Sequence, residues 1–485
     1  MLRIVVLIAA SLPLVFFTRL VLHPGIGRRL RGFPSVHVIV IAIVVASVLA
    51  LIVAVAFLPF LFLAALGSIG LILFDAIRRQ PSYGVRRGLP PGSLAMFSTS
   101  PWSDPDYYSK AARLHGHTFK FQHLNRPAAG IVGIKRIEEF LRAHSNDLEV
   151  PAAPFNEIIP AGFVRYLHGA EHDRVAAALR TAFNPAVIAH HDVRLRDEST
   201  RAVNLLESAS QVTDILEELT FRALVILFFD LEPDDASTLK ALFHEADYRQ
   251  LSRTGKTKAR NAVNAIIQQM RVIAQDETKV SFLAYLVKSD PAAVQDDAIL
   301  GNLAYALHTG RIDVAGLLAW LIAVAGTNHG SMRKLSDAIA AIPEESQKAG
   351  GIADRTVRET LRLHQSEFIL RRATRDILFE GYRIPAGWHV RLCIAESHRA
   401  PESFANAQVF DPDRFLEPHS RSVYAPFGFA PHSCPGEHLT RAIGRHFVGA
   451  LASRADLEIS NAEPWEFTGF HWRPNSQMRI RRMSH

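Results

Sequence analysis

Apolar side chains recur every three or four residues over much of the chain, a spacing that predicts amphipathic helices. Helices are predicted in this way at 171–182, 212–228, 257–275, 296–326, 352–364 and 437–453. Short strand-like pieces lie late in the chain, at Leu370 to Thr374, Tyr382 to Ile384 and His389 to Ile394. The sequence Ile384-Pro385-Ala386-Gly387 between the last two predicts a hairpin turn. We therefore expect a mainly α domain with a small β portion.

The longest helical pattern runs from Asp296 to Gly326. Asp296 and Asp297 stand at its start, where negative charge interacts favourably with the helix dipole. As one helix it would be about 46 Å long, enough to cross a whole domain.

The N-terminal region contains two long apolar runs. Ile4 to Phe17 is apolar apart from Ser11, and 36–74 contains no charged residue apart from the titratable His37. One helix over the second run would be about 58 Å long, roughly twice the hydrocarbon thickness of a bilayer. We therefore expect a helical hairpin with Pro59 near the bend.

Arginines flank the second run on both sides: Arg28, Arg29 and Arg31 precede it, and Arg78, Arg79, Arg86 and Arg87 follow it. The positive-inside rule then places both ends of the run on the cytoplasmic side. This predicts an anchor of about three transmembrane segments, near 4–22, 36–57 and 59–75, with the rest of the chain in the cytoplasm. Two alternatives stay open, a signal peptide for the first run and a single over-long or interfacial helix for the second.

The segment Leu89-Pro90-Pro91-Gly92 is a stiff, extended break after the anchor. We place the domain boundary near it, with a membrane anchor at 1–85 and a second domain at 86–485. The second part has roughly 400 residues, enough for a single large catalytic domain.

The amino-acid composition limits which binding partners and which metal or disulfide sites are expected. Apolar residues make up 48% and charged residues 21%, so a large core is possible. The formal net charge of +7 suits anionic lipid or an acidic protein partner. Nucleic acid fits poorly, because no compact Lys/Arg block is interleaved with aromatic residues. The only two cysteines, Cys393 and Cys434, exclude a disulfide framework and a four-cysteine metal site, and they indicate a reducing compartment.

Cys434 follows a run of small and turn-forming residues and precedes a helix predicted to begin near Glu437. Free backbone N–H groups and the dipole at a helix N-terminus favour a thiolate over a thiol. A thiolate is the proximal ligand that heme iron needs to cleave O–O bonds. Gly436 would let the backbone pass close to a flat cofactor. Cys393 lies inside a predicted strand and is interpreted as a core residue.

This segment resembles the cysteine loop of the cytochrome P450 family, usually F-x-x-G-x-R-x-C-x-G. Phe427, Cys434 and Gly436 match the pattern. Ala430 replaces the usual glycine, and His432 replaces the usual arginine, although a histidine can still donate to a heme propionate.

Two further motifs fit the same family. Glu359 and Arg362 resemble its E-x-x-R pair, and Arg414 would complete a charge triad that is structural rather than catalytic. Asp413 replaces the usual glutamate before Arg414.

Two residues resemble the family's contacts with the heme propionates. Arg371 is one, and strand alternation makes Arg372 face the other way. His172, at the start of a predicted helix, is the other; the arginine often found four residues later is Ala176 here, and Arg174 is a poor substitute.

The family's oxygen-activating helix usually carries A-G-x-D-T-T, and its best match begins at Gly310 and includes Asp313. The resemblance implies that Gly310 lets the helix open beside the iron and that a buried Asp313 relays protons to bound dioxygen. Val314 and Ala315 cannot supply the usual alcohol, so the relay needs water, a substrate hydroxyl or Thr309.

The resemblance covers most of 86–485 and implies a mainly helical prism with a small sheet, which binds heme b. It implies a monooxygenase that inserts one atom of O2 into an apolar organic substrate. Electrons would come from a separate reductase or ferredoxin, because the chain has no Gly-rich dinucleotide fingerprint and no cysteine cluster. Three alternatives stay open: a peroxide-using peroxygenase, a non-catalytic heme-binding membrane sensor, and a zinc site of His432, Cys434 and His438.

Overall fold

The computed structural model describes residues 58–96, 100–123, 126–151, 156–159, 162–209, 211–248, 250, 252–341, 348–365, 368–429, 432–454, 457–468 and 472–482. The predicted transmembrane segments near 4–22 and 36–57 lie outside these ranges. The chain divides into two compact units, the first made of Met1–Gly130 and Asp376–His389 and the second of Ile131–Arg375 and Val390–His485. The predicted boundary at residue 85 falls inside the first unit and stays a prediction.

The first unit contains helices α4 (Leu58–Arg79), η1 (Val85–Arg87), α5 (Ser100–Ser103) and α6 (Tyr107–His115), with strands β1 (Thr118–His123), β2 (Arg126–Val132), β5 (Ile377–Phe379) and β6 (Tyr382–Ile384). Lys120 of β1 forms hydrogen bonds with the predicted break at Leu89-Pro90-Pro91-Gly92 and with the chain just before it. Its Nζ donates to the carbonyl oxygens of Pro81 at 3.0 Å and Pro90 at 2.7 Å. The segment around Pro90 is therefore fixed against a strand.

The predicted turn at Ile384-Pro385-Ala386-Gly387 is present, with the Trp388 N–H donating to the carbonyl oxygen of Pro385 at 3.1 Å, but the predicted hairpin is wrong. β6 pairs instead with β5, which precedes it, in a two-stranded antiparallel sheet. The turn between them contains Glu380 and Gly381, whose φ angles are 48° and 79°. Two successive residues with positive φ match the twist of a tight hairpin, and this explains the pairing.

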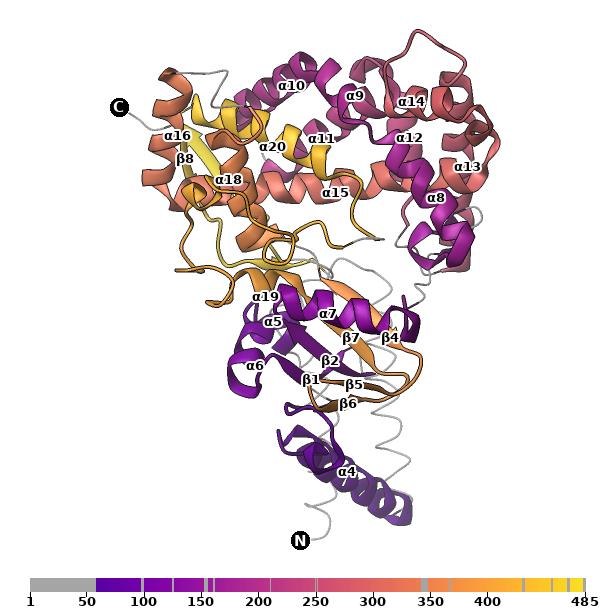
Figure 1. Ribbon diagram of the computed structural model, residues 1–485, viewed down its shortest axis with the longest axis vertical. Coiled ribbons are helices and arrows are strands. Elements are labelled where there is room, and N and C mark those ends of the chain that lie inside the picture. Colours follow the sequence, from indigo (N-terminus) through magenta and orange to yellow (C-terminus); the bar gives the residue numbers. More distant parts are fainter. Residues whose placement is uncertain are drawn as a thin grey trace. The chain divides into compact units, whose positions relative to one another are not determined.

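The second unit is mainly helical (Figure 1). Its longer helices are α7 (Ile134–His144), α8 (Gly169–Ala182), α10 (Asp192–Leu205), α11 (Val212–Phe229), α12 (Ser237–Glu245), α13 (Arg253–Ile273), α14 (Phe282–Ser289), α15 (Asp297–Thr327), α16 (His329–Ala341), α18 (Ile352–Thr360) and α20 (Glu437–Ala452). Short elements are η2 (Ser145–Asp147), η3 (Asn156–Ile158), η4 (Val164–Tyr166), α9 (Pro185–His190), η5 (Leu206–Ser208), η6 (Pro233–Asp235), η7 (Pro291–Gln295), the π-helical η8 (Leu361–Gln365), α19 (Ile394–His398) and η9 (Pro412–Phe415). The six predicted helices are confirmed within a few residues at their ends.

Helix α15 crosses this unit, and α11 and α20 pack against it (Figure 1). Asp296 caps its N-terminus by accepting hydrogen bonds from the backbone N–H groups of Ala298 and Ile299. Helix α15 has the length and the apolar composition of a helix that could span a bilayer. Most of it is buried inside the protein, as expected of a core helix.

The β portion of this unit is small, as predicted. Strands β7 (His389–Cys393), β4 (Ile369–Ala373) and β3 (Leu148–Glu149) are neighbours in one sheet. β8 (Leu457–Ser460) pairs with β11 (Arg479–Arg482), and β9 (Glu466–Phe467) pairs with β10 (Trp472–Arg473), both antiparallel.

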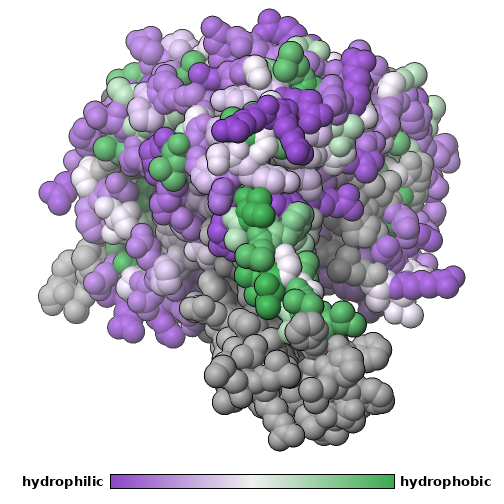
Figure 2. All heavy atoms as spheres, turned by 90° about the horizontal axis from the view of Figure 1, so that it is seen from below, coloured by the Kyte–Doolittle hydropathy of each residue, from purple (hydrophilic) through white to green (hydrophobic). Residues whose placement is uncertain are grey.

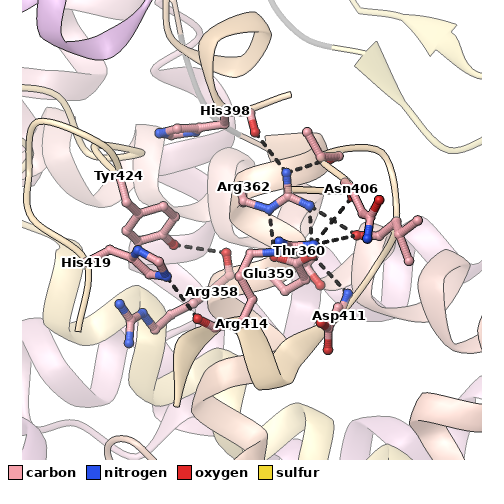
Figure 3. A network of polar contacts seen from close by, with 12 residues as sticks. Arg358, Glu359, Thr360, Arg362, His398, Asn406, Asp411, Arg414, His419 and Tyr424 are labelled. Atoms are coloured by element: carbon pink, nitrogen blue, oxygen red, sulfur yellow. Dashed lines mark hydrogen bonds and ion pairs between the residues drawn. The ribbon is translucent and has the colours of Figure 1, made fainter. Parts of the chain in front are cut away.

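The predicted charge triad is present (Figure 3). Arg362 donates to both carboxylate oxygens of Glu359 at 2.7 Å, and neither side chain is exposed. Arg414 Nε lies 3.5 Å from Glu359 Oε1. Arg362 also donates to the carbonyl oxygens of His398 and Ala407. The triad therefore fixes the irregular chain before the cysteine loop, as the structural role predicted.

Candidate functional site

Cys434 stands immediately before α20, as predicted from the sequence. Its backbone N–H donates to the carbonyl oxygen of Phe427 at 2.9 Å, which closes the loop between them. The N–H of Gly436 lies 3.3 Å from Cys434 Sγ and points its partial positive charge at the sulfur. The side chain of Cys434 is exposed. A sulfur anion at this place would be stabilised by the donor and the helix dipole, and it could reach a metal.

Glycines shape the loop at two places. Gly428, which the sequence pattern did not single out, has a φ of 75°, a conformation that L residues rarely adopt. A Cβ on Gly436 would lie 3.5 Å from Cys434 Sγ, so a side chain there would crowd the sulfur. Ala430, the other departure from the family loop, lies outside the described residues.

His172 of α8 and His432 of the cysteine loop are brought together. Nε2 of His172 lies 3.1 Å from Nδ1 of His432, so one ring donates to the other. Burial, together with the charges of Arg371, His172, Arg165 and His168, lowers the pKa of His432 to about 4. Basic side chains from four segments therefore surround this point. Arg165 and His168 were missed in the sequence, because only the fold brings them here.

Arg371 and Arg372 face opposite sides of β4, as strand alternation predicts. Arg371 is buried, and its Nη1 donates to the carbonyl oxygen of Leu370. Arg372 forms an ion pair with Glu149 of the neighbouring strand β3. Arg174 does not replace the arginine missing at Ala176, because it pairs with Glu171 and Asp296 on an exposed face.

Asp313 lies on α15, but the prediction that it is buried is wrong. Its side chain is 52% exposed, and its Oδ1 lies 3.8 Å from Arg473 Nη2 of β10. A carboxylate with access to solvent and a cation avoids the cost of desolvation that a buried one would meet. Counting from Gly310 in the A-G-x-D-T-T pattern, Ile312 takes the acid's place and Asp313 takes the place of the first threonine.

Gly310 and Thr309 flank this turn of α15. A Cβ on Gly310 would lie in ordinary contact with Leu224 of α11, 3.5 Å away, so this glycine faces the neighbouring helix. The hydroxyl of Thr309 donates to the carbonyl oxygen of Tyr305 in its own helix at 3.0 Å. In this conformation the Thr309 proton is engaged by the helix backbone.

The structure also bears on two further hypotheses from the sequence, the core role of Cys393 and the zinc site. Cys393 is fully buried, and burial raises the pKa of its thiol, which fits the core role. Among the described residues, which include His432, Cys434 and His438, no three His, Cys, Asp or Glu side chains form a metal site. The zinc alternative is therefore not supported by the structure.

Comparisons with known proteins show the family to which the chain belongs. The family model for cytochrome P450 matches residues 223–471, a little over half of the chain. An abscisic acid 8'-hydroxylase of rice (Oryza sativa) is 25% identical over 46% of this chain, and the match spans 48% of that relative, about half of its length. An abscisic acid 8'-hydroxylase of tomato (Solanum lycopersicum) is 24% identical over 73% of this chain and 82% of its own length.

Solved structures share the fold. A retinoic acid-bound cyanobacterial cytochrome P450 superposes with a TM-score of 0.67 at 18% identity, over 81% of this chain and 99% of that chain. A cytochrome P450 of Bacillus subtilis from a bacillaene polyketide synthase gives 0.63 at 17% identity, over 80% and 99%. The fold expected from the sequence is thus confirmed. The chain belongs to the cytochrome P450 family.

Proposed function

We propose that this protein is a monooxygenase that holds heme through Cys434 and inserts one oxygen atom into an apolar organic substrate. The observation that carries the proposal is the exposed sulfur of Cys434 at the N-terminus of α20, 3.3 Å from the Gly436 N–H. That N–H and the helix dipole favour the anionic form of the sulfur, which as a ligand of heme iron promotes O–O cleavage.

Basic side chains near the loop would hold the heme's carboxylates. Arg371 is a buried cation on β4, and His172 and His432 share a hydrogen bond beside it. Phe427 and Gly436 would line the loop against the ring, where a bulky residue at 436 would crowd the sulfur. Because Cys393 is fully buried, no second cysteine is available to bond a porphyrin. The fit is to heme b, held without covalent attachment to its ring.

When bound, the heme supplies the splitting of dioxygen. The protein's own part on the distal side is proton supply, for which Asp313 is the candidate at the turn of α15 next to Gly310. Its exposed carboxylate can take a proton from solvent and pass it inward. Val314 and Ala315 offer no hydroxyl to this path.

The relatives favour an apolar acid as substrate. The rice and tomato relatives are named for abscisic acid, and the cyanobacterial structure contains retinoic acid. Both ligands join a largely hydrocarbon body to one carboxylate. A separate reductase or ferredoxin would supply electrons one at a time.

The N-terminal region would anchor the protein to a membrane. Helix α4 has 22 residues, about 33 Å, which matches the hydrocarbon thickness of a bilayer. Large apolar side chains along it are exposed, among them Leu63 (64%), Leu71 (54%) and Leu73 (59%). Figure 2 shows this apolar surface in green, below the centre of the view. Arg78 and Arg79 end the helix, which fits a cytoplasmic end for the proposed third crossing within an anchor at 1–85.

Turnover separates the proposed function from its alternatives. The purified full chain in lipid is supplied with a P450 reductase, NADPH and either retinoic acid or abscisic acid, and products are identified by mass spectrometry. A product heavier by one oxygen atom, absent without reductase, is the expected result. Turnover with hydrogen peroxide but none with reductase would make the protein a peroxygenase. A heme band shift on adding the acid without turnover in either system would make it a sensor.

A further inference from the structure

Arg473 reaches from strand β10 to the backbone of the distal helix. Its Nη2 lies 3.4 Å from the carbonyl oxygen of Ile312, to which it donates, although 161 positions separate the two residues in sequence. The same nitrogen lies 3.8 Å from Oδ1 of Asp313. One guanidinium thus contacts both the backbone and the acid of a single helical turn.

Gly316 makes this approach possible. A Cβ built on Gly316 would lie 0.7 Å from Nη1 and 1.8 Å from Cζ of Arg473. The guanidinium therefore occupies the space that any side chain at 316 would need. A glycine in mid-helix is less favourable than alanine by about 1 kcal/mol, so the close approach gives it a physical reason. Asp313 and Gly316 are three residues apart and share one face of α15.

Arg473 is the buried partner of this pair and Asp313 the exposed one. The side chain of Arg473 is 13% exposed, whereas that of Asp313 is 52% exposed. Burial lowers the pKa of Arg473, while Asp313 and Glu217 of α11 act in the opposite direction. A guanidinium still keeps its charge at neutral pH. Its position on the helix therefore sets where a carboxylate at 313 is held.

We propose that Arg473 is a positioning residue for Asp313, packed on Gly316 so that the carboxylate is held in a fixed direction at the 312–316 turn. This rests on the proposed function, in which Asp313 relays protons. Val314 and Ala315 have no hydroxyl group that could orient the carboxylate of Asp313. In this proposal Arg473 of strand β10 orients it instead.

Thermal unfolding, which needs no turnover, tests whether Arg473 packs on Gly316. In the holoprotein, Gly316→Ala should lower Tm by roughly 2–4 °C, because the new methyl collides with the guanidinium. In an Arg473→Ala background the same change should have no effect or raise Tm. Gly330→Ala, where a Cβ would meet nothing within 4 Å, is the matched control and should be neutral in both backgrounds. If Gly316→Ala changed Tm equally in both backgrounds, the close packing of Arg473 on Gly316 would be contradicted.

The positioning role is tested by peroxide-driven oxidation of guaiacol, which needs neither the electron donor nor the native substrate. Arg473→Gln should lower kcat roughly tenfold with KM for guaiacol unchanged, because proton transfer is impaired. Arg473→Lys, which keeps the charge, should recover most of this loss. The exposed Arg479→Gln on β11 serves as control and should match the wild type.

Equal losses in Arg473→Lys and Arg473→Gln, or a change in KM alone, would show that Arg473 only fills space. Either result leaves the proposed function standing, provided that the variants keep the carbon monoxide spectrum of a heme thiolate. Loss of that spectrum in the wild type would instead refute the proposed function itself.

Discussion

His172 Nε2 lies 3.1 Å from His432 Nδ1, although the two residues are 260 positions apart in the chain. The contact joins α8 to the loop that carries Cys434. It also places the imidazole rings of both histidines next to the buried guanidinium of Arg371. Three separate segments therefore converge where a heme would present its carboxylates.

His172→Leu should weaken heme binding without unfolding the protein. The change removes the hydrogen bond with His432 and the proposed contact with one propionate, together worth about 1–3 kcal/mol. We expect heme to transfer to an excess of apomyoglobin about ten times faster than from the wild type. His172→Gln, which keeps a donor, should lie between the two. An unchanged transfer rate in His172→Leu would place the propionates elsewhere.

Arg362→Leu should destabilise the protein severely. Glu359 is fully buried, and the substitution would leave it with Arg414 as its remaining arginine, 3.5 Å away. Removing one partner of a buried ion pair is destabilising by about 3–5 kcal/mol. Denaturant unfolding of the holoprotein measures this loss. Arg355→Leu, whose ion pair with Asp413 is partly exposed, is the control and should lose less than about 1 kcal/mol.

The lowered pKa of Lys120 leads us to expect that the protein becomes more stable as the pH rises into the alkaline range. Burial lowers its pKa to about 8, below the value of about 10.4 in an unfolded chain. Between these values the unfolded state binds more protons than the folded state, so stability rises with pH. Urea unfolding at pH 7, 8, 9 and 10 should show this rise in the difference between wild type and Lys120→Met. A difference that is flat or falls over this interval would contradict the assignment.

We expect opposite results for the same substitution at Tyr248 and at Tyr424. Among the described residues the hydroxyl of Tyr248 has no hydrogen-bond partner, whereas that of Tyr424 donates to the carbonyl oxygen of Arg358 at 3.0 Å. Tyr248→Phe should be neutral or stabilising, and Tyr424→Phe should destabilise by about 1 kcal/mol. Denaturant midpoints compare the two. A clear loss in Tyr248→Phe would mean that its hydroxyl has a partner in solution, such as water.

The helices and the cysteine loop could be predicted because their signals are local. The apolar spacing alone identified α15, and the residues around Cys434 specify a turn followed by a helix N-terminus. Strand alternation likewise separated Arg371 from Arg372. These inferences need only residues within a few positions of one another.

The errors came from contacts that are distant in sequence. Apolar neighbours of Asp313 suggested burial, but Arg473 and access to solvent decide its surroundings. The β5–β6 pairing depends on positive φ at Glu380, which few sequence rules would assign to a glutamate. Arg165 and His168 join the basic cluster only through the path of the chain before α8. No local pattern could have placed them there.

The central claim is a bond from the sulfur of Cys434 to heme iron, and its most direct test is the spectrum of the reduced, carbon monoxide-treated protein. The wild type and Cys393→Ala, the matched control at the chain's other cysteine, should show the absorbance band that gives the family its name. Cys434→Ala should lose it while remaining folded by circular dichroism. A folded, heme-loaded wild type without the band, or a Cys434→Ala variant that retains it, would contradict the account.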